Sequence, residues 1–197
     1  MQHVPINAIV HKNVAHNLVV LYMCLEKKNT EEINMSDLAD VLATVSGAEQ
    51  LLPAIKSLQT CHDVLEWHAV EGLGNIMMRV RLGSSCLPAT VQSLESVSEL
   101  RVMQILDDYK IATEGEPGAE AYILIEAKEE HRDEVFKVIT QMKEIQACSH
   151  TAGEYGVVAR VRGTSFEWIE QFIAVRIRTL GHVQRVRHCD VINLEGF

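Results

Sequence analysis

The second half of the chain shows the clearest pattern of apolar and polar positions. Residues 121–127 form an almost unbroken apolar run, which is typical of a buried strand. Residues 131–145 carry apolar side chains at helical spacing, with acidic residues near the start that complement the helix dipole. Strands are predicted at 147–151 and 157–162, on either side of a glycine-containing turn.

A second helix and a final strand complete this half. Thr164 or Ser165 can cap a helix whose apolar positions run to Ile177, and Gly181 is a common signal for the end of a helix. Residues 182–193 are predicted to form the last strand. The order βαββαβ predicts an α+β fold of the ferredoxin-like type.

The first half shows a related pattern. Residues 72–84 align with 153–164 if one extra residue is allowed, and both stretches carry Arg-Val-Arg shortly after a glycine turn. A helix is predicted at 48–59 before this segment, and a helix and a strand are predicted after it, near 88–97 and 101–111. The pattern predicts two tandem ferredoxin-like repeats, which would form a pseudo-dimer within one chain.

The N-terminal residues fit this repeat less well. Leu18 to Leu25 is a short apolar run that suits either the missing first strand or a buried helix. Residues 34–42, with Ser36 as a cap, predict an extra helix that is an insertion in the first repeat. The region 14–60 also allows a helix-turn-helix, although Pro53 would interrupt its recognition helix.

A segment rich in glycine, proline and acidic residues separates the two halves. Residues 113–120 read Thr-Glu-Gly-Glu-Pro-Gly-Ala-Glu, which is the composition of a linker. We therefore expect a degenerate repeat with an N-terminal extension over 1–112, a linker over 113–120 and a second domain over 121–197.

The bulk composition narrows the class of protein. The net charge of −9 offers no electrostatic footprint for a nucleic-acid backbone. The longest apolar runs are too short to cross a bilayer, so no membrane partner is expected. The five cysteines are scattered without a paired spacing, and the N-terminus does not read as a signal peptide. A cytoplasmic protein with reduced thiols is expected.

Four segments of the second half occur in a characteristic order. They are the apolar strand at 122–125, the turn Thr-Ala-Gly-Glu-Tyr-Gly at 151–156, the strand at 157–162 and the closing Gly-His-Val-Gln-Arg at 181–185. In this order they resemble the effector-binding domain of the Lrp/AsnC transcription regulators. Two features depart from that pattern: an inserted alanine before the glycine turn, and Gly156 where the family usually has an acidic residue.

The resemblance implies a domain that self-associates through its sheets and binds a small effector, such as an amino acid, near the glycine turn. The candidate effector-binding residues are Gly153, Glu154, Tyr155, Gly156 and Arg160, and their first-repeat equivalents are Gly72, Gly74, Asn75 and Arg79. Read without the resemblance, such glycine turns merely connect strands, and the arginines belong to a solvated or salt-bridged sheet edge.

The leading hypothesis is a small-molecule-sensing regulatory protein that acts through ligand-dependent oligomer assembly. One alternative is a DNA-binding regulator that uses residues 14–60, and another is an enzyme or haem protein of the dimeric α/β-barrel type. The sequence contains no catalytic motif, and its nine histidines lack a metal-binding spacing. We therefore expect no catalytic residue, no metal ligand and no cofactor, and a protein that is not an enzyme.

Overall fold

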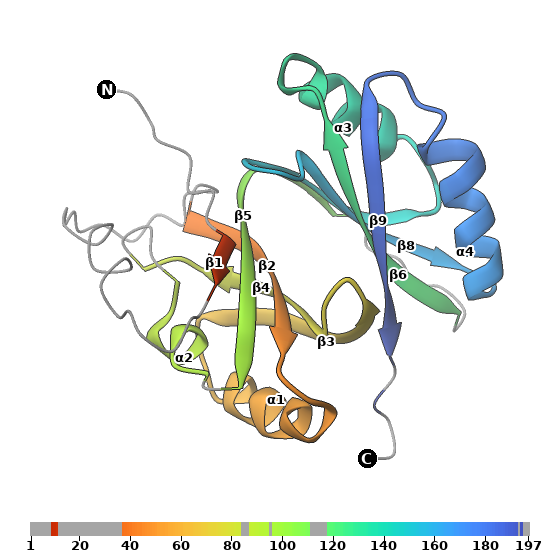
Figure 1. Cartoon of the computed structure of the whole chain (residues 1–197). Coiled ribbons are helices and arrows are strands. Elements are labelled where there is room, and N and C mark those ends of the chain that lie inside the picture. Colours follow the sequence, from red (N-terminus) through yellow and green to blue (C-terminus); the bar gives the residue numbers. More distant parts are fainter. Residues whose placement is uncertain are drawn as a thin grey trace, which may run out of the picture.

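The computed structural model of the chain is shown in Figure 1. It describes residues 9–11, 37–83, 87–94, 96–110, 118–192 and 194. In these residues nine strands pair antiparallel in one sheet, accompanied by a few short helices. The predicted α+β class is confirmed. No helix in the described ranges is long and apolar enough to cross a membrane.

The first half begins its regular structure with a strand and alternates strands with short helices. A three-residue strand from the N-terminal region, β1 (Ile9–His11), pairs with the last strand of this half. The other elements are β2 (Leu38–Val45), α1 (Leu51–Gln59), β3 (Val64–Gly72), β4 (Ile76–Arg81), α2 (Ala89–Gln92) and β5 (Val97–Lys110).

The second half follows the predicted order of elements. They are β6 (Ala119–Ala127), α3 (Arg132–Thr140), β7 (Ile145–Thr151), β8 (Val157–Gly163), α4 (Phe166–Phe172) and β9 (Val183–Ile192). Ser165 begins α4 because its hydroxyl accepts a hydrogen bond from the Trp168 backbone N–H at 3.2 Å. The helical path continues through a π turn at Ile173–Ile177 before the loop to β9.

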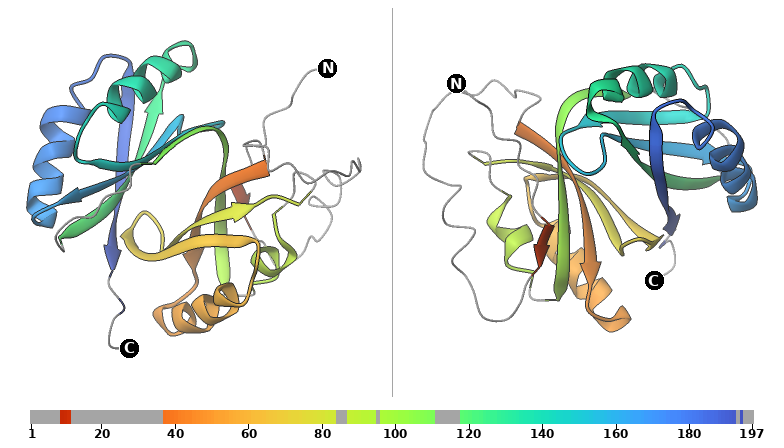
Figure 2. Two further views of the ribbon diagram at one scale, coloured as in Figure 1. Left: turned by 180° about the vertical axis from the view of Figure 1, so that it is seen from behind. Right: turned by 45° about the horizontal axis from the view of Figure 1, so that its top comes forward.

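The strands close into a barrel. Their order in the described part of the chain is β1-β5-β2-β4-β3-β9-β6-β8-β7, and β5 also pairs with β7. That extra pairing joins the two ends of the sheet, so every strand except β1 belongs to a closed ring. The halves meet at two seams, β3 with β9 and β5 with β7. Figures 1 and 2 show the helices on the outside of this ring.

Side chains alternate between the outside and the inside of the barrel. On β6, Ile123 and Ile125 pack outward against the residues of α3 and α4. Leu124, which lies between them, points inward and packs in a central cluster with Leu42 of β2 and Met77 of β4. Both faces of the strands are therefore buried, which explains why their sequences are continuous apolar runs rather than alternating ones.

The same burial corrects the prediction for residues 34–42. From Leu38 onward this segment is strand β2, not a helix, because its side chains are buried on both faces of the sheet. Strand β2 therefore takes the place of the predicted helical insertion, which is wrong over these residues. A helix-turn-helix over 14–60 loses its second helix for the same reason. Residues 12–36, which include Leu18–Leu25, lie outside the described part.

The boundary between the halves also shifts slightly. Strand β6 already begins at Ala119, within the segment predicted as a linker. Ala119 pairs with Gly163, the last residue of β8, so the backbone of Ala119 belongs to the sheet. Residues 113–117 of the predicted linker lie outside the described residues.

Candidate functional site

An arginine and two aspartates meet inside the barrel, between strands of both halves. Arg79 of β4 donates from Nε to Asp40 Oδ1 at 2.9 Å and from Nη1 to Asp108 Oδ2 at 2.8 Å. Its Nη2 donates to the hydroxyl of Ser149, on β7, at 2.7 Å. That hydroxyl also lies 2.8 Å from Asp40 Oδ2 and 3.2 Å from Asp108 Oδ1. We call these four residues the Arg79 network.

The Arg79 network has the character of a structural tie. Burial by itself would lower the pKa of Arg79, but the carboxylates of Asp40 and Asp108 outweigh this effect and raise it. The guanidinium stays charged, and each of its nitrogens already has a partner from the chain. A ligand could bind Arg79 only by displacing one of these partners, at the cost of a buried unpaired carboxylate.

A second polar group lies beside the first and opens toward the surface. Glu66 and His68 of β3, Tyr122 of β6 and Arg160 of β8 form this group, which we call the Arg160 pocket. Tyr122 Oη lies 2.8 Å from His68 Nδ1, and Arg160 Nη1 donates to Glu66 Oε1 at 2.6 Å. The same Nη1 lies 3.5 Å from His68 Nε2.

The pocket contains a cavity of about 20 Å³, lined on one side by Asp40, Arg79 and Ser149 of the Arg79 network. This volume accommodates one oxygen-sized group. The Nε of Arg160 is buried and has no hydrogen-bond acceptor among the described residues. A buried guanidinium N–H without an acceptor favours the binding of a small anionic oxygen.

Charges around the pocket determine the protonation of its members. Burial lowers the pKa of His68; Glu66 opposes this effect and Arg160 reinforces it, so the imidazole is neutral at pH 7. Burial would raise the pKa of Glu66, but Arg160 and then Lys110 lower it, so the carboxylate is ionised. Burial raises the pKa of Tyr122, and Glu66 raises it further, so the phenol keeps its proton.

The contacts of His68 favour one of its two tautomers. Arg160 can only donate, so its contact with Nε2 leaves the ring hydrogen on Nδ1. In this tautomer Nδ1–H donates to the Tyr122 oxygen, which leaves the Tyr122 O–H available as a donor. The pocket thus combines a cation, a neutral proton donor and a neutral imidazole that can resupply it.

The predicted glycine turn of the second half connects β7 and β8 and is engaged by arginines of the chain. The backbone oxygen of Gly153 accepts a hydrogen bond from Arg132 Nη2 at 2.7 Å. A side chain at Gly156 would collide with Arg132, because a Cβ there would lie 2.6 Å from its Cδ. Arg160, the fifth candidate, belongs to the Arg160 pocket rather than to this turn.

The other two candidates of that turn are also paired. Glu154 forms an ion pair with Arg185 of β9. Tyr155 is buried in the central cluster, and its hydroxyl accepts a hydrogen bond from Arg101 Nη1 at 3.1 Å. The structure therefore brings Gly153 to Gly156 together at one turn, with their polar groups bound by neighbouring strands and helices.

The equivalent turn of the first half connects β3 and β4 and has a structural geometry. Asn75 Oδ1 accepts a hydrogen bond from the Val45 backbone N–H at 2.8 Å. A Cβ at Gly74 would lie 2.7 Å from a leucine side chain of β2. Gly72 has a positive φ of 124° and lies against the backbone of β9. Arg79, the fourth candidate of this set, lies in the Arg79 network.

We expect the substitution Gly72→Ala to destabilise the protein by about 1–3 kcal/mol, since the backbone is in a left-handed region and the new Cβ would overpack the seam. That Cβ would lie 3.0 Å from the His188 carbonyl oxygen, where β3 pairs with β9. Urea unfolding monitored by circular dichroism measures the change. Gly83→Ala is the matched control, because a Cβ there meets nothing within 4 Å. Equal stabilities of the two variants would contradict this account of the seam.

Comparison with known families bears on the second half. The family model described as "Lrp/AsnC ligand binding domain" matches residues 120–193, from β6 through β9. Residues 120–193 are similar to an Lrp/AsnC ligand binding domain. The predicted resemblance is confirmed, and the Lrp/AsnC domain contributes Tyr122 and Arg160 to the pocket, while β3 of the first half contributes Glu66 and His68. A comparison of the whole sequence with curated proteins found no match.

Several solved structures are similar to this chain in fold, at low sequence identity. The siroheme decarboxylase NirDL has a similar fold, with a TM-score of 0.65 and 10% identity, over 82% of this chain and 74% of the other. For NirDL in co-complex with an iron-uroporphyrin III analogue, the TM-score is 0.63 and the identity 11%, over 82% of this chain and 73% of the other. For AsnC from E. coli, the TM-score is 0.37 and the identity 14%, over 44% of this chain and 64% of the other.

The similarity to NirDL corrects one expectation. The sequence analysis predicted a protein that is not an enzyme, and this prediction is wrong, because the fold that spans both halves is shared with an enzyme, a siroheme decarboxylase.

Sequence reasoning missed most of the Arg160 pocket. The sequence analysis treats His68 only as one of nine histidines without a metal-binding spacing, and Tyr122 only as part of an apolar strand. The signal that could have found them is polarity at inward positions of otherwise apolar strands, since a buried polar group needs a partner.

Proposed function

We propose that this protein is an enzyme that transfers a proton to a carboxylate-bearing small molecule bound at the Arg160 pocket. The observation that carries this proposal is the buried Arg160 Nε without an acceptor, beside the hydrogen-bonded pair of Tyr122 and His68. The cation holds the anionic group, and the phenol supplies the proton.

The reaction that fits these groups best is the loss of CO2 from the substrate. The bond between the carboxylate and its neighbouring carbon breaks, and the electron pair stays on that carbon. Tyr122 then donates its proton to the carbon, forming a C–H bond. His68 returns a proton to Tyr122 from Nδ1 and regains one from solvent. No electron acceptor or donor is needed, because the proton balances the departing CO2.

The similar fold supports this choice, because NirDL is named as a decarboxylase and its substrate siroheme carries carboxylates. The cavity of about 20 Å³ accommodates a single carboxylate oxygen and not a macrocycle. A large substrate would therefore lie outside the pocket and insert one arm. Lys110, which is exposed and lies 3.5 Å from Glu66, adds a positive charge at the rim.

The experiment incubates the full-length protein with siroheme under anaerobic conditions and follows the loss of CO2 by mass spectrometry. Binding is measured separately from the shift of the siroheme absorption band. We expect Arg160→Met to weaken binding by about 10- to 100-fold, since it removes a charge-assisted hydrogen bond.

Arg162→Met is the matched control, because Arg162 lies two residues along β8 and is already paired with Glu120. The control should retain the affinity of the unmodified chain. The proposal is contradicted if the unmodified chain neither binds siroheme nor releases CO2, or if both arginine variants bind it equally.

A second candidate function is small-molecule sensing, which the Lrp/AsnC domain favours. In this alternative an effector such as an amino acid binds near Gly153–Gly156 or at Arg160 and shifts self-association, and the two halves act as a pseudo-dimer. Size-exclusion chromatography with and without a panel of amino acids tests it: a change of assembly with one amino acid supports sensing. The cytoplasmic location stays a prediction.

A further inference from the structure

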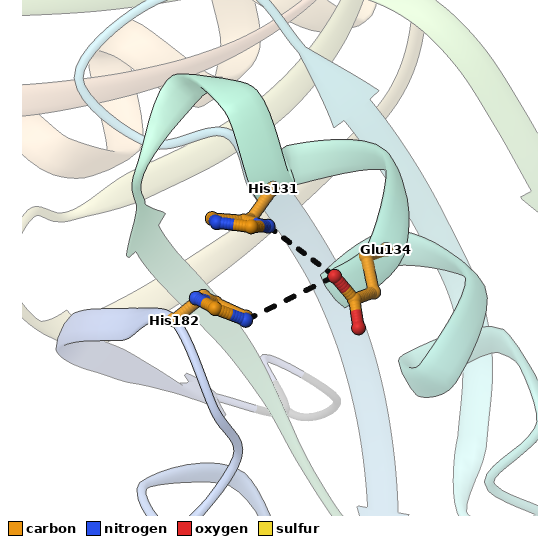
Figure 3. A group of neighbouring side chains, drawn as sticks. All are labelled: His131, Glu134 and His182. Carbon is orange, nitrogen blue, oxygen red and sulfur yellow. Dashed lines mark hydrogen bonds and ion pairs between the residues drawn. The ribbon is translucent and has the colours of Figure 1, made fainter.

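Two histidines and a glutamate meet at the outer end of the second half, beyond the last residue of β6. His131 ends the turn before α3, Glu134 lies in the first turn of α3, and His182 lies in the loop before β9. Figure 3 shows both imidazoles facing the same carboxylate. His131 Nδ1 lies 3.3 Å and His182 Nε2 lies 3.9 Å from Glu134 Oε2. We call these three residues the His-His-Glu cluster.

The spacing of the ligand atoms matches a tetrahedral metal site. All three ligand atoms lie within 4.8 Å of one another. Ligands at about 2.0–2.1 Å from a tetrahedral Zn²⁺ are separated from each other by roughly 3.3 Å. The pair His131 and Glu134 already has this separation, and the distance between His182 Nε2 and Glu134 Oε2 would need to shorten by about 0.6 Å. Because the two imidazole rings are stacked, the binding of one ion also requires one ring to rotate, which these partly exposed side chains allow.

The backbone holds the cluster in place before any ion binds. His182 has a φ of 70°, a left-handed conformation that few residues other than glycine and asparagine adopt. The Lys128 backbone N–H donates to the His182 carbonyl at 3.4 Å, and the His131 N–H donates to the Lys128 carbonyl at 2.9 Å. The two imidazole rings are stacked, with their centroids 3.5 Å apart. The backbone thus places His182 beside His131 and Glu134, although His182 lies far from them in the sequence.

We propose that the His-His-Glu cluster is a binding site for Zn²⁺ or a related divalent transition-metal ion. Two imidazoles and one carboxylate supply three ligands of the type that zinc prefers, and the fourth position stays open to solvent. The ion would link the start of α3 to the loop before β9. The site lies apart from the Arg160 pocket and does not depend on the proposed function.

The test titrates the full-length, chelator-treated protein with ZnCl2 by isothermal titration calorimetry. His182→Asn is the main variant, because asparagine tolerates the left-handed conformation but cannot replace the imidazole in this site. We expect it to bind one equivalent of Zn²⁺ fewer than the unmodified chain, or to bind that equivalent at least about tenfold more weakly. His131→Gln should give the same loss through a different element.

His188→Asn is the matched control, because this histidine lies on β9 outside the cluster and pairs only loosely with Asp190, at 4.0 Å. It should bind as much Zn²⁺ as the unmodified chain. Comparing variants cancels binding by histidines and cysteines elsewhere in the chain. The proposal is overturned if His182→Asn and His131→Gln retain both the stoichiometry and the affinity of the unmodified chain.

Discussion

Replacing Arg79 by methionine is expected to lower the free energy of unfolding by about 3–5 kcal/mol. The substitution leaves the carboxylates of Asp40 and Asp108 inside the barrel without their cation. The Ser149 hydroxyl would remain as a hydrogen-bond donor, but its single hydrogen cannot satisfy two buried carboxylates. Because these residues belong to β2, β4, β5 and β7, the loss also weakens the seam between the halves.

Urea unfolding followed by circular dichroism measures this change, with the slope of the transition compared to confirm two-state behaviour. Arg185→Met is the matched control: it also removes an arginine paired with two carboxylates, but at the surface, where ion pairs contribute little. If Arg79→Met were no less stable than Arg185→Met, the Arg79 network would not be the tie between the halves that its geometry suggests.

The second large effect is expected from Tyr122→Phe, which should reduce kcat for CO2 loss from siroheme by about 10²- to 10⁴-fold. The substitution removes only the hydroxyl that donates the proton and keeps the partly buried ring. The effect should fall on kcat rather than on KM, because Arg160 still holds the carboxylate. The rate is measured by mass spectrometry under anaerobic conditions, and this prediction rests on the proposed function.

Tyr109→Phe is the control for Tyr122→Phe, since Tyr109 is partly exposed and lies outside the pocket.

His68→Gln should slow the same step, and its effect on stability gives a second measurement. The pKa of folded His68 lies below its unfolded value near 6.5, so the unfolded chain binds the proton first. Stability should be highest above about pH 6.5 and fall as the pH drops toward 5, less steeply in His68→Gln. Unchanged turnover in Tyr122→Phe would exclude the phenol as the proton donor.

The candidate site could be predicted only in part. Arg79 and Arg160 were identified from their positions after the glycine turns, because strand alternation places them on one face of their strands. That face was expected to be a sheet edge, and it is the inside of the barrel. The partners of these arginines could not be predicted, because the pairing of β3 with β9 and of β5 with β7 joins residues that no local pattern connects.

Periodicity and turn residues alone were sufficient for the strands and helices of residues 119–192, and for their resemblance to an Lrp/AsnC domain. Helical spacing and glycine turns are local patterns, so they can be recognised in the sequence without knowledge of the rest of the fold. Strand β2 was mistaken for a helix because it is buried on both faces and lacks alternation. The Arg160 pocket arises only when strand pairing brings the two halves together. The His-His-Glu cluster arises only when the second half folds, because the loop before β9 then meets the start of α3.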